Sequence, residues 1–354
     1  MKKRNKRHWR GGKKMKTIKF NGTHYEIGLK QGKFYKKEKL KLRKKIDKKL
    51  LDKQIEIYKK FYPEHLEKLK GISDAMKEPL EKVQFNFIAF PLQQLKRKIK
   101  RENGCTIFGI KTNETTIVGR NYDWVPITQR IFEINTINLH GKIYFIAVSD
   151  MGIWKNKKDS FIYDIVDAIN KEGLYIGLTF AYDNHYNYGV WPTDMISLIA
   201  ENCKNIKEVK EKFKKIPLAC PKNFFIADKK GEFCIIEHTS KKFKVIKPKD
   251  NFLIQTNNYL DKELSKEDVV LKEKPENDTY IRYYEILQAI NHYKKKLTLN
   301  KVKKILDNPK THLFEKQKLM KTIWTLALDM KNKKYRLYYN LQNKIKHKNL
   351  SLEF

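Results

Sequence analysis

The sequence contains no long hydrophobic run. No stretch approaches the eighteen or so apolar residues that a helical membrane span requires. The basic start, residues 1–16, is not followed by the apolar segment that a secretory signal contains. We therefore expect a cytoplasmic protein without a membrane span. The length of 354 residues is sufficient to bury a sizeable core, in one large domain or two smaller ones.

Cysteine is scarce. The spacing of the four cysteines matches neither a zinc site nor a dense disulfide framework, so we predict no metal site. Three of them are expected to be small core residues in a reducing compartment, and the fourth is treated below. The four are Cys105, Cys203, Cys220 and Cys234.

Acidic residues are few. The chain has 77 Lys and Arg against 40 Asp and Glu, which gives a net charge of +37. The lysines are spread along the sequence, whereas binding of phosphates needs cations gathered on one face. We favour a solvated lysine surface and no specific nucleic-acid partner. Residues 1–16 form the one basic cluster of the sequence, and we predict a disordered tail there.

The residues from 17 to 104 have a helical pattern. Apolar residues recur near the 3.6-residue period over residues 31–62, until Pro63 interrupts them. A second apolar stripe follows Pro63, and a third, aromatic-rich helix is expected after Pro79. The stripes contain Leu42, Ile46, Leu50, Ile55, Leu66, Leu69, Ile72 and Met76.

After Gly104 the apolar period changes from 3.6 to 2, which indicates strands. Residues 161–180 predict a hairpin with its turn at 170–173, where Gly173 can take a positive φ. We expect helical segments over 193–213 and 279–293, and a last hairpin over 325–339. Helices between pairs of strands predict an α+β layered architecture.

Cys105 opens this strand-rich region, and Arg120 and Asp123 follow it on the next predicted strand. A catalytic cysteine acts as a thiolate, so it needs a nearby cation and a base. The base could be His185 or His238, brought close by folding.

Cleavage before Cys105 offers another base. If the bond between Gly104 and Cys105 were cut, Cys105 would gain an α-amino group whose pKa is about 7.7–8.0. One residue would then carry both nucleophile and base. Taken alone, however, Cys105 is typical of a buried structural thiol, and Arg120 with Asp123 is typical of a cross-strand ion pair.

Several motifs occur in an order that resembles one family. Residues 104–106 and 119–124 are followed by 170–180, then by 256–258 and by 280–282. The combination resembles the N-terminal-nucleophile (Ntn) hydrolases of the linear-amide type, which include choloylglycine hydrolases, penicillin V acylases and the isopenicillin N acyltransferase-like C45 peptidases. The resemblance implies a four-layer αββα sandwich over residues 105–354, preceded by a helical pro-segment over 17–104.

The resemblance also implies residue roles. Cys105 would attack the carbonyl of Gly104 in a self-cleavage and would then attack substrate amides. Arg120 would lie beside the thiolate, and Asp123 would hold the new α-amino group. The remaining roles are oxyanion donors from the Asn257 side chain and the backbone N–H near Thr179, and a position close to the nucleophile for Arg282.

The function implied is hydrolysis of a small-molecule acyl amide, or transfer of its acyl group, through a thioester on Cys105. No cofactor or metal is implied, and a homo-oligomer is compatible with the sequence. The 104 preceding residues resemble the acyltransferase-like branch, and Thr179 stands where bile-salt enzymes have asparagine. The aromatic segment from Tyr182 to Trp191 is the candidate wall of the acyl pocket.

Two other hypotheses remain. The chain could be a basic binding protein that keeps the fold and uses its lysine surface for polyanions, or it could be an inactive relative. In either case the site residues would have ordinary structural roles. Arg282, for example, would be a solvated charge on a helix, and Asn257 would be a turn residue.

Overall fold

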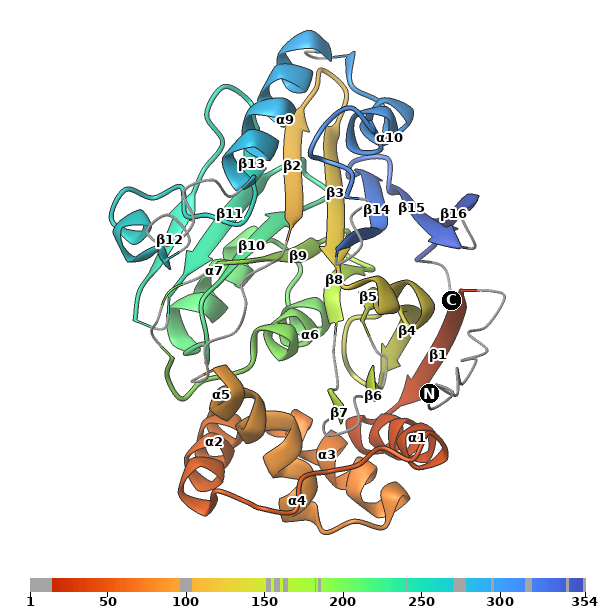
Figure 1. The fold of residues 1–354 in the computed structure, drawn as a ribbon, viewed down its shortest axis with the longest axis vertical. Coiled ribbons are helices and arrows are strands. Elements are labelled where there is room, and N and C mark those ends of the chain that lie inside the picture. Colours follow the sequence, from red (N-terminus) through yellow and green to blue (C-terminus); the bar gives the residue numbers. More distant parts are fainter. Residues whose placement is uncertain are drawn as a thin grey trace, which may run out of the picture.

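The computed structural model describes residues 15–95, 104–150, 154–155, 160–161, 165–181, 183, 186–239, 241–269, 278–293, 296–315, 320–341 and 344–352. Two large β-sheets lie face to face, and helices cover their outer sides (Figure 1). The bond between Gly104 and Cys105 falls within the described residues.

The first sheet has eight strands in the order β1-β4-β5-β8-β9-β10-β11-β12. All neighbours are antiparallel except β1 and β4, which run parallel. The bounds are β1 Lys16–Gly22, β4 Glu133–Leu139, β5 Phe145–Ser149, β8 Ile165–Asn170, β9 Tyr175–Phe180, β10 Lys222–Ala227, β11 Phe233–His238 and β12 Phe243–Ile246.

The second sheet has six antiparallel strands in the order β13-β2-β3-β14-β15-β16. Strand β2 also contacts β9 of the first sheet, so the two sheets meet there. The bounds are β13 Phe252–Gln255, β2 Cys105–Lys111, β3 Thr116–Trp124, β14 Lys321–Asp329, β15 Lys334–Leu341 and β16 Lys344–Leu350. A separate short pair consists of β6 Trp154–Lys155 and β7 Ser160–Phe161.

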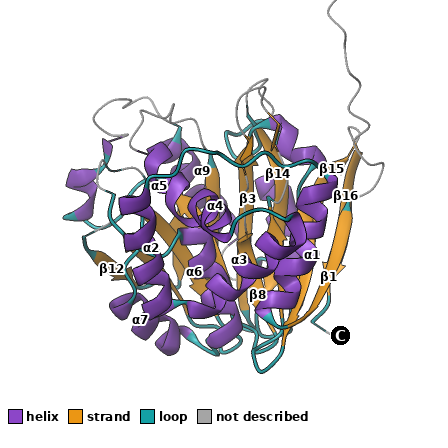
Figure 2. Cartoon of the chain, turned by 90° about the horizontal axis from the view of Figure 1, so that it is seen from below, coloured by secondary structure: helices purple, strands orange, loops and turns teal. Residues whose placement is uncertain are grey.

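Helices cover both sheets. The N-terminal helices lie together beside the first sheet with α6, as the view from below shows (Figure 2), while α9 and α10 pack on the second sheet. The bounds are α1 His24–Lys37, α2 Lys48–Phe61, α3 Pro63–Met76, α4 Leu80–Gln84, the π-helix η1 Phe85–Ala89, α5 Phe90–Leu95, the 3₁₀-helix η2 Pro126–Arg130, α6 Pro192–Asn202, α7 Ile206–Lys215, the 3₁₀-helix η3 Leu264–Glu267, α9 Thr279–Tyr293 and α10 Leu299–Leu306.

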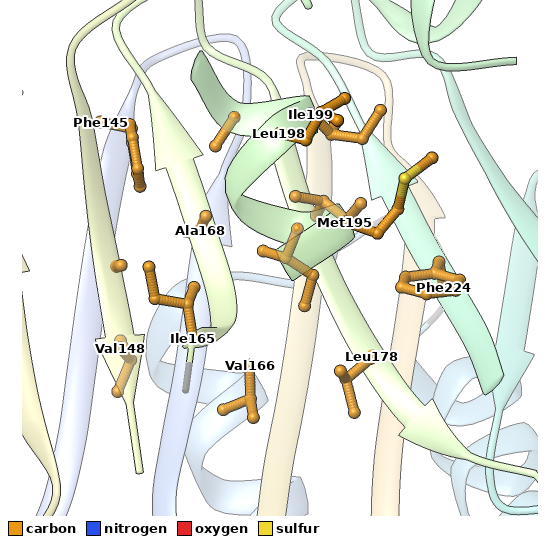
Figure 3. Packing of buried hydrophobic residues seen from close by; sticks show 14 of the residues in the cluster. Phe145, Val148, Ile165, Val166, Ala168, Leu178, Met195, Leu198, Ile199 and Phe224 are labelled. Atoms are coloured by element: carbon orange, nitrogen blue, oxygen red, sulfur yellow. The ribbon is translucent and has the colours of Figure 1, made fainter. Parts of the chain in front are cut away.

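The first sheet packs against α6 through a continuous apolar core (Figure 3). Met195, Leu198 and Ile199 of α6 lie over strands β5, β8, β9 and β10 and are all buried. Every residue of β8 is buried, because the strand is covered by α6 on one face and by the second sheet on the other. Polar side chains on such a strand must therefore find partners inside the protein.

The α+β prediction and its two sheets between helical layers are confirmed. The hairpin over 161–180 is also present as β8 and β9, and Gly173 has φ +78° in its turn. Other boundaries differ. The helix expected over 31–62 is two helices, α1 and α2, and the one expected over 193–213 is α6 and α7.

The segment 17–104 is not wholly helical, because it begins with strand β1. Ile18, Phe20 and Gly22 of that strand face inward and alternate with exposed Thr17, Lys19 and Asn21, which is the period-2 pattern of a half-buried edge strand. The predicted tail, residues 1–16, lies almost entirely outside the described residues. Within the described part of the chain, no helix is long and apolar enough to cross a membrane, and no group of three acidic, cysteine or histidine side chains could hold a metal.

Candidate active site

Cys105 is the first residue of β2 and is fully buried. Its register partner on β3 is Tyr122, so the next residue, Asp123, lies opposite Gly104. The Asp123 N–H donates to the Gly104 carbonyl oxygen at 3.0 Å. The Cys105 N–H donates to Oδ1 of Asn257 at 2.7 Å. Both polar atoms of the peptide bond before Cys105 are therefore hydrogen-bonded.

Arg282 of α9 holds the first two residues of β2, Cys105 and Thr106, in place. Its Nη1 donates to the Cys105 carbonyl oxygen at 2.6 Å and to Oγ1 of Thr106 at 3.0 Å. Its Nη2 donates to Oδ1 of Asn257 at 3.1 Å and to Oδ1 of Asp278 at 3.2 Å. Arg282 is fully buried, so the interpretation as a solvated charge is wrong.

Asn257 connects the start of β2 to β9. Its Nδ2 donates to the carbonyl oxygen of Phe180 at 3.0 Å, and its own N–H donates to Oγ1 of Thr279 at 2.8 Å. Next to it, Oγ1 of Thr179 donates to the Thr256 carbonyl oxygen at 2.8 Å. The two segments predicted to supply oxyanion donors are therefore in direct contact with each other and, through Asn257, with Cys105.

Asp123 is a buried carboxyl group with one supported oxygen. Oγ1 of Thr322, on β14, donates to its Oδ1 at 2.6 Å. The other oxygen, Oδ2, has no hydrogen-bond partner among the described residues. It faces Gly104, since a Cβ added at Gly104 would lie 3.1 Å from it. Burial raises the pKa of Asp123 to about 7, although Thr322 and Arg282 oppose the shift.

The thiol of Cys105 is subject to opposing effects. Burial raises its pKa, and the Asp123 charge acts in the same direction. The positive charges of Arg120 and Arg282 lower it, as does a hydrogen bond from the Asp123 N–H. Burial dominates in the uncut chain, so the thiol is protonated at neutral pH.

Arg120 does not pair with Asp123. Its Nε donates to Oδ2 of Asp167, on β8, at 2.6 Å, so the cross-strand ion pair that the two residues suggested is absent. Tyr175 and Trp324 also donate to Asp167. Neither Asp167 nor Thr322 is predicted from the sequence as a site residue. The one signal for Asp167 is an acidic residue inside the apolar run of a predicted strand.

Stacked aromatic rings run along the end of β3 beside Cys105, whose register partner is Tyr122. Trp324 stacks on Tyr122 with centroids 4.2 Å apart, and Trp124 stacks on Phe180 at 5.1 Å. The ring centroids of Tyr122 and Trp124 are 6.3 Å apart, with an angle of 29° between the ring planes. Nζ of Lys222 lies 4.3 Å from the Phe180 ring centroid. This stack fixes the end of β3 relative to the end of β9, and hence the thiol relative to Asn257.

Of the other predicted site residues, Tyr182 and His185 are outside the described residues. His238 is on β11, two strands from β9, where it packs against Phe213 and Phe243. Burial lowers its pKa to about 4. The N–H of Trp191 donates to the hydroxyl of Tyr58 in α2 at 3.0 Å. This bond attaches Trp191, the last residue of the predicted pocket wall, to the N-terminal helices.

Many chains of solved structures match the fold, among them those of the following two proteins. A single-residue mutant of the conjugated bile acid hydrolase from Clostridium perfringens is 16% identical, with 71% of this chain and 93% of that chain covered and a TM-score of 0.43. Penicillin V acylase from Agrobacterium tumefaciens is 15% identical, with 70% and 86% covered and a TM-score of 0.48. No curated protein sequence matches the chain.

The sequence model of one family matches a large part of the chain. This is the acyl-coenzyme A:6-aminopenicillanic acid acyl-transferase family, and the match spans residues 110–344. It includes Arg120, Asp123, Asn257 and Arg282 and begins five residues after Cys105. Since the match covers well over half of the sequence, the chain belongs to the acyl-coenzyme A:6-aminopenicillanic acid acyl-transferase family.

Proposed function

We propose that this protein is a self-processing enzyme that cleaves linear amides, or transfers their acyl groups, with Cys105 as its N-terminal nucleophile. One observation carries the proposal. The Asp123 N–H donates to the Gly104 carbonyl oxygen at 3.0 Å. This carbonyl belongs to the peptide bond that precedes the buried Cys105, so the group that the thiol would attack already has a hydrogen-bond donor at its oxygen.

The first reaction cuts the chain. The Cys105 sulfur attacks the carbonyl carbon of Gly104, and the thiol proton passes to the departing nitrogen. The negative charge develops on the Gly104 oxygen, where the Asp123 N–H is already in place at 3.0 Å. The C–N bond breaks to leave a thioester and a free α-amino group. Water then hydrolyses the thioester, giving a carboxylate on Gly104 and a free thiol on Cys105.

The second reaction acts on a substrate amide. The new α-amino group takes the thiol proton and later donates a proton to the leaving amine. Oδ2 of Asp123 faces Gly104, the residue before this nitrogen, and lacks a hydrogen-bond partner among the described residues, so we propose that it would hold the ammonium form. The acyl group passes to Cys105 and then to water, or to an acceptor amine in a transferase reaction. The residues required come from this chain alone, without a cofactor.

The oxyanion of this second reaction needs its own donors. One hydrogen of Asn257 Nδ2 is used by Phe180, so the second is available to a substrate oxyanion. The backbone N–H near Thr179 is the proposed second donor. The segment from Tyr182 to Trp191 begins two residues after Phe180, and we propose that it forms the wall of the acyl pocket for a small-molecule substrate.

Intact mass under denaturing conditions tests the cut. Wild type is expected to give two pieces, residues 1–104 and 105–354, and Cys105→Ala a single chain. Cys203→Ala is the matched control, because Cys203 is equally buried but lies at the end of α6. That variant should cut as wild type does. A wild-type chain that stays whole, like Cys105→Ala, would remove the self-processing claim.

A further inference from the structure

Asp167 is a buried carboxylate that joins four strands from both sheets. It lies on β8 and accepts three hydrogen bonds. Nε of Arg120, on β3, donates to Oδ2 at 2.6 Å, and Nε1 of Trp324, on β14, donates to the same oxygen at 3.1 Å. The hydroxyl of Tyr175, on β9, donates to Oδ1 at 2.9 Å. Such a fully engaged carboxylate has one fixed orientation.

The ion pair uses only one nitrogen of the guanidinium group. Nη1 and Nη2 of Arg120 are buried and have no hydrogen-bond partner among the described residues. Arg120 and Tyr122 share one face of β3, and the register partner of Tyr122 is Cys105. Asp167 therefore holds Arg120 by Nε, and the two terminal nitrogens remain available on the side of the nucleophile.

The neighbouring backbone leaves room for this arrangement. Gly177 of β9 pairs with Asp167 in the sheet register. A Cβ at Gly177 would overlap both the Tyr175 hydroxyl and Oδ1 of Asp167. A glycine is thus required where the carboxylate and the phenol meet, which indicates that the sequence accommodates the cluster at a specific point of the fold.

We propose that Asp167 is a positioning residue, which fixes Arg120 so that its terminal nitrogens face the Cys105 sulfur and stabilise the thiolate. The inference rests on the proposed function, since it assigns a role in the nucleophile's activation. The proposal predicts that removal of the Asp167 carboxylate destabilises the Cys105 thiolate and so raises the midpoint of its titration, even though the positive charge of Arg120 remains. If Asp167 merely neutralised the charge of Arg120, its removal would instead favour the thiolate and lower the titration midpoint.

The test compares thiolate titrations of wild type and Asp167→Asn. The thiolate is followed by its ultraviolet absorbance against pH, with the signal of Cys105→Ser subtracted, so the titration can be read in a cut or an uncut chain. Among the described residues, the other charged or titratable groups that act on the sulfur are Asp123, Arg282 and Tyr175, and both proteins keep them. In a cut chain the new α-amino group of Cys105 also acts on the sulfur, so the two proteins are compared in the same state, both cut or both uncut.

We expect the midpoint of the thiolate titration to rise by about one pH unit or more in Asp167→Asn. Without the Asp167 carboxylate, Arg120 no longer has the ion pair that holds its guanidinium group near the sulfur. In the processed enzyme kcat should fall more than KM rises. A midpoint that falls would mean that Asp167 only compensates charge. An unchanged midpoint, even with a lower melting temperature, would mean a purely structural role. Either result overturns the proposal.

Two further variants serve as a control and as an alternative to Asp167→Asn. Asp228→Asn removes another buried carboxylate, which caps the turn between β10 and β11, and should lower stability without moving the midpoint. If Asp167→Asn does not fold, Tyr175→Phe removes one donor to Asp167 and should move the midpoint upward by less. No rise in that variant would overturn the proposal. A wild type that does not cut refutes the self-processing claim alone.

Discussion

Replacement of Arg282 by lysine distinguishes a buried structural cation from a solvated surface charge. The guanidinium group of Arg282 serves four acceptors, two from each terminal nitrogen. A lysine keeps the positive charge but presents its donors from a single nitrogen at the end of a shorter reach. It cannot bind the acceptors on Cys105 and Thr106 together with those on Asn257 and Asp278.

The expected loss follows from the buried acceptors that lose a charged donor. Asp278 is partly exposed, so water can replace that contact. Of the three buried acceptors, the ammonium group can serve one or two. At least one buried acceptor loses its charged donor, and each such loss costs about 1–3 kcal/mol. We therefore expect Arg282→Lys to lower the free energy of unfolding by about 2–4 kcal/mol.

Unfolding by guanidinium chloride measures this change in the free energy of unfolding. A Cys105→Ala background avoids interference from chain cleavage. Arg336→Lys is the control, because Arg336 bonds Asn349, Asn300 and Tyr338 near the surface. Its effect should stay within about 0.5 kcal/mol. If Arg282→Lys also stays within that range, Arg282 is not the buried clamp that its contacts describe, and the reasoning fails.

Two further predictions concern the cut and the pH dependence of stability. Gly104→Ala should slow self-cleavage, because the new Cβ would press on Oδ2 of Asp123 at 3.1 Å; a time course by intact mass measures this, and an unchanged rate would contradict the close approach. Burial raises the pKa of Asp150 from 3.8 to about 8. Between about pH 4 and pH 8 the folded chain therefore holds a proton that the unfolded chain has released, so this group lowers stability as pH rises through that window. Asp150→Asn should melt at a higher temperature than wild type above about pH 8, with a smaller difference near pH 5, and a gain that is the same at both pH values would refute the assignment.

The sequence was sufficient to predict what depends on local pattern. The hairpin of β8 and β9 follows from apolar residues on either side of a turn with Gly173, and the structure confirms it. The ends of β2 and β3 that carry Cys105 and Asp123 are adjacent through hairpin register alone, because Cys105 pairs with Tyr122. The contacts of Asn257 and Arg282 with Cys105 required the resemblance, since these residues are far apart in the sequence.

Contacts between residues of the two different sheets could not be predicted from the sequence. The partner of Arg120 depends on how β3 lies over β8, and no spacing rule relates residues 120 and 167. Asp123, three residues from Arg120, was therefore the natural but wrong candidate. Thr322 escaped notice for the same reason, since its strand β14 joins β3 from the other end of the chain.

Strand β1 gives the segment before the proposed cut a permanent structural role. It pairs with β4 over seven residue positions and so completes the edge of the eight-stranded sheet. Farther along, Gln54 of α2 donates to the Gly189 carbonyl oxygen and accepts the Gly189 N–H, and Tyr58 donates to buried Asp194 of α6. Separation of the two pieces would expose these polar groups together with an unpaired strand edge, at a cost of several kcal/mol. Cleavage after Gly104 would therefore create a new chain end beside the thiol while the N-terminal piece remains part of the fold.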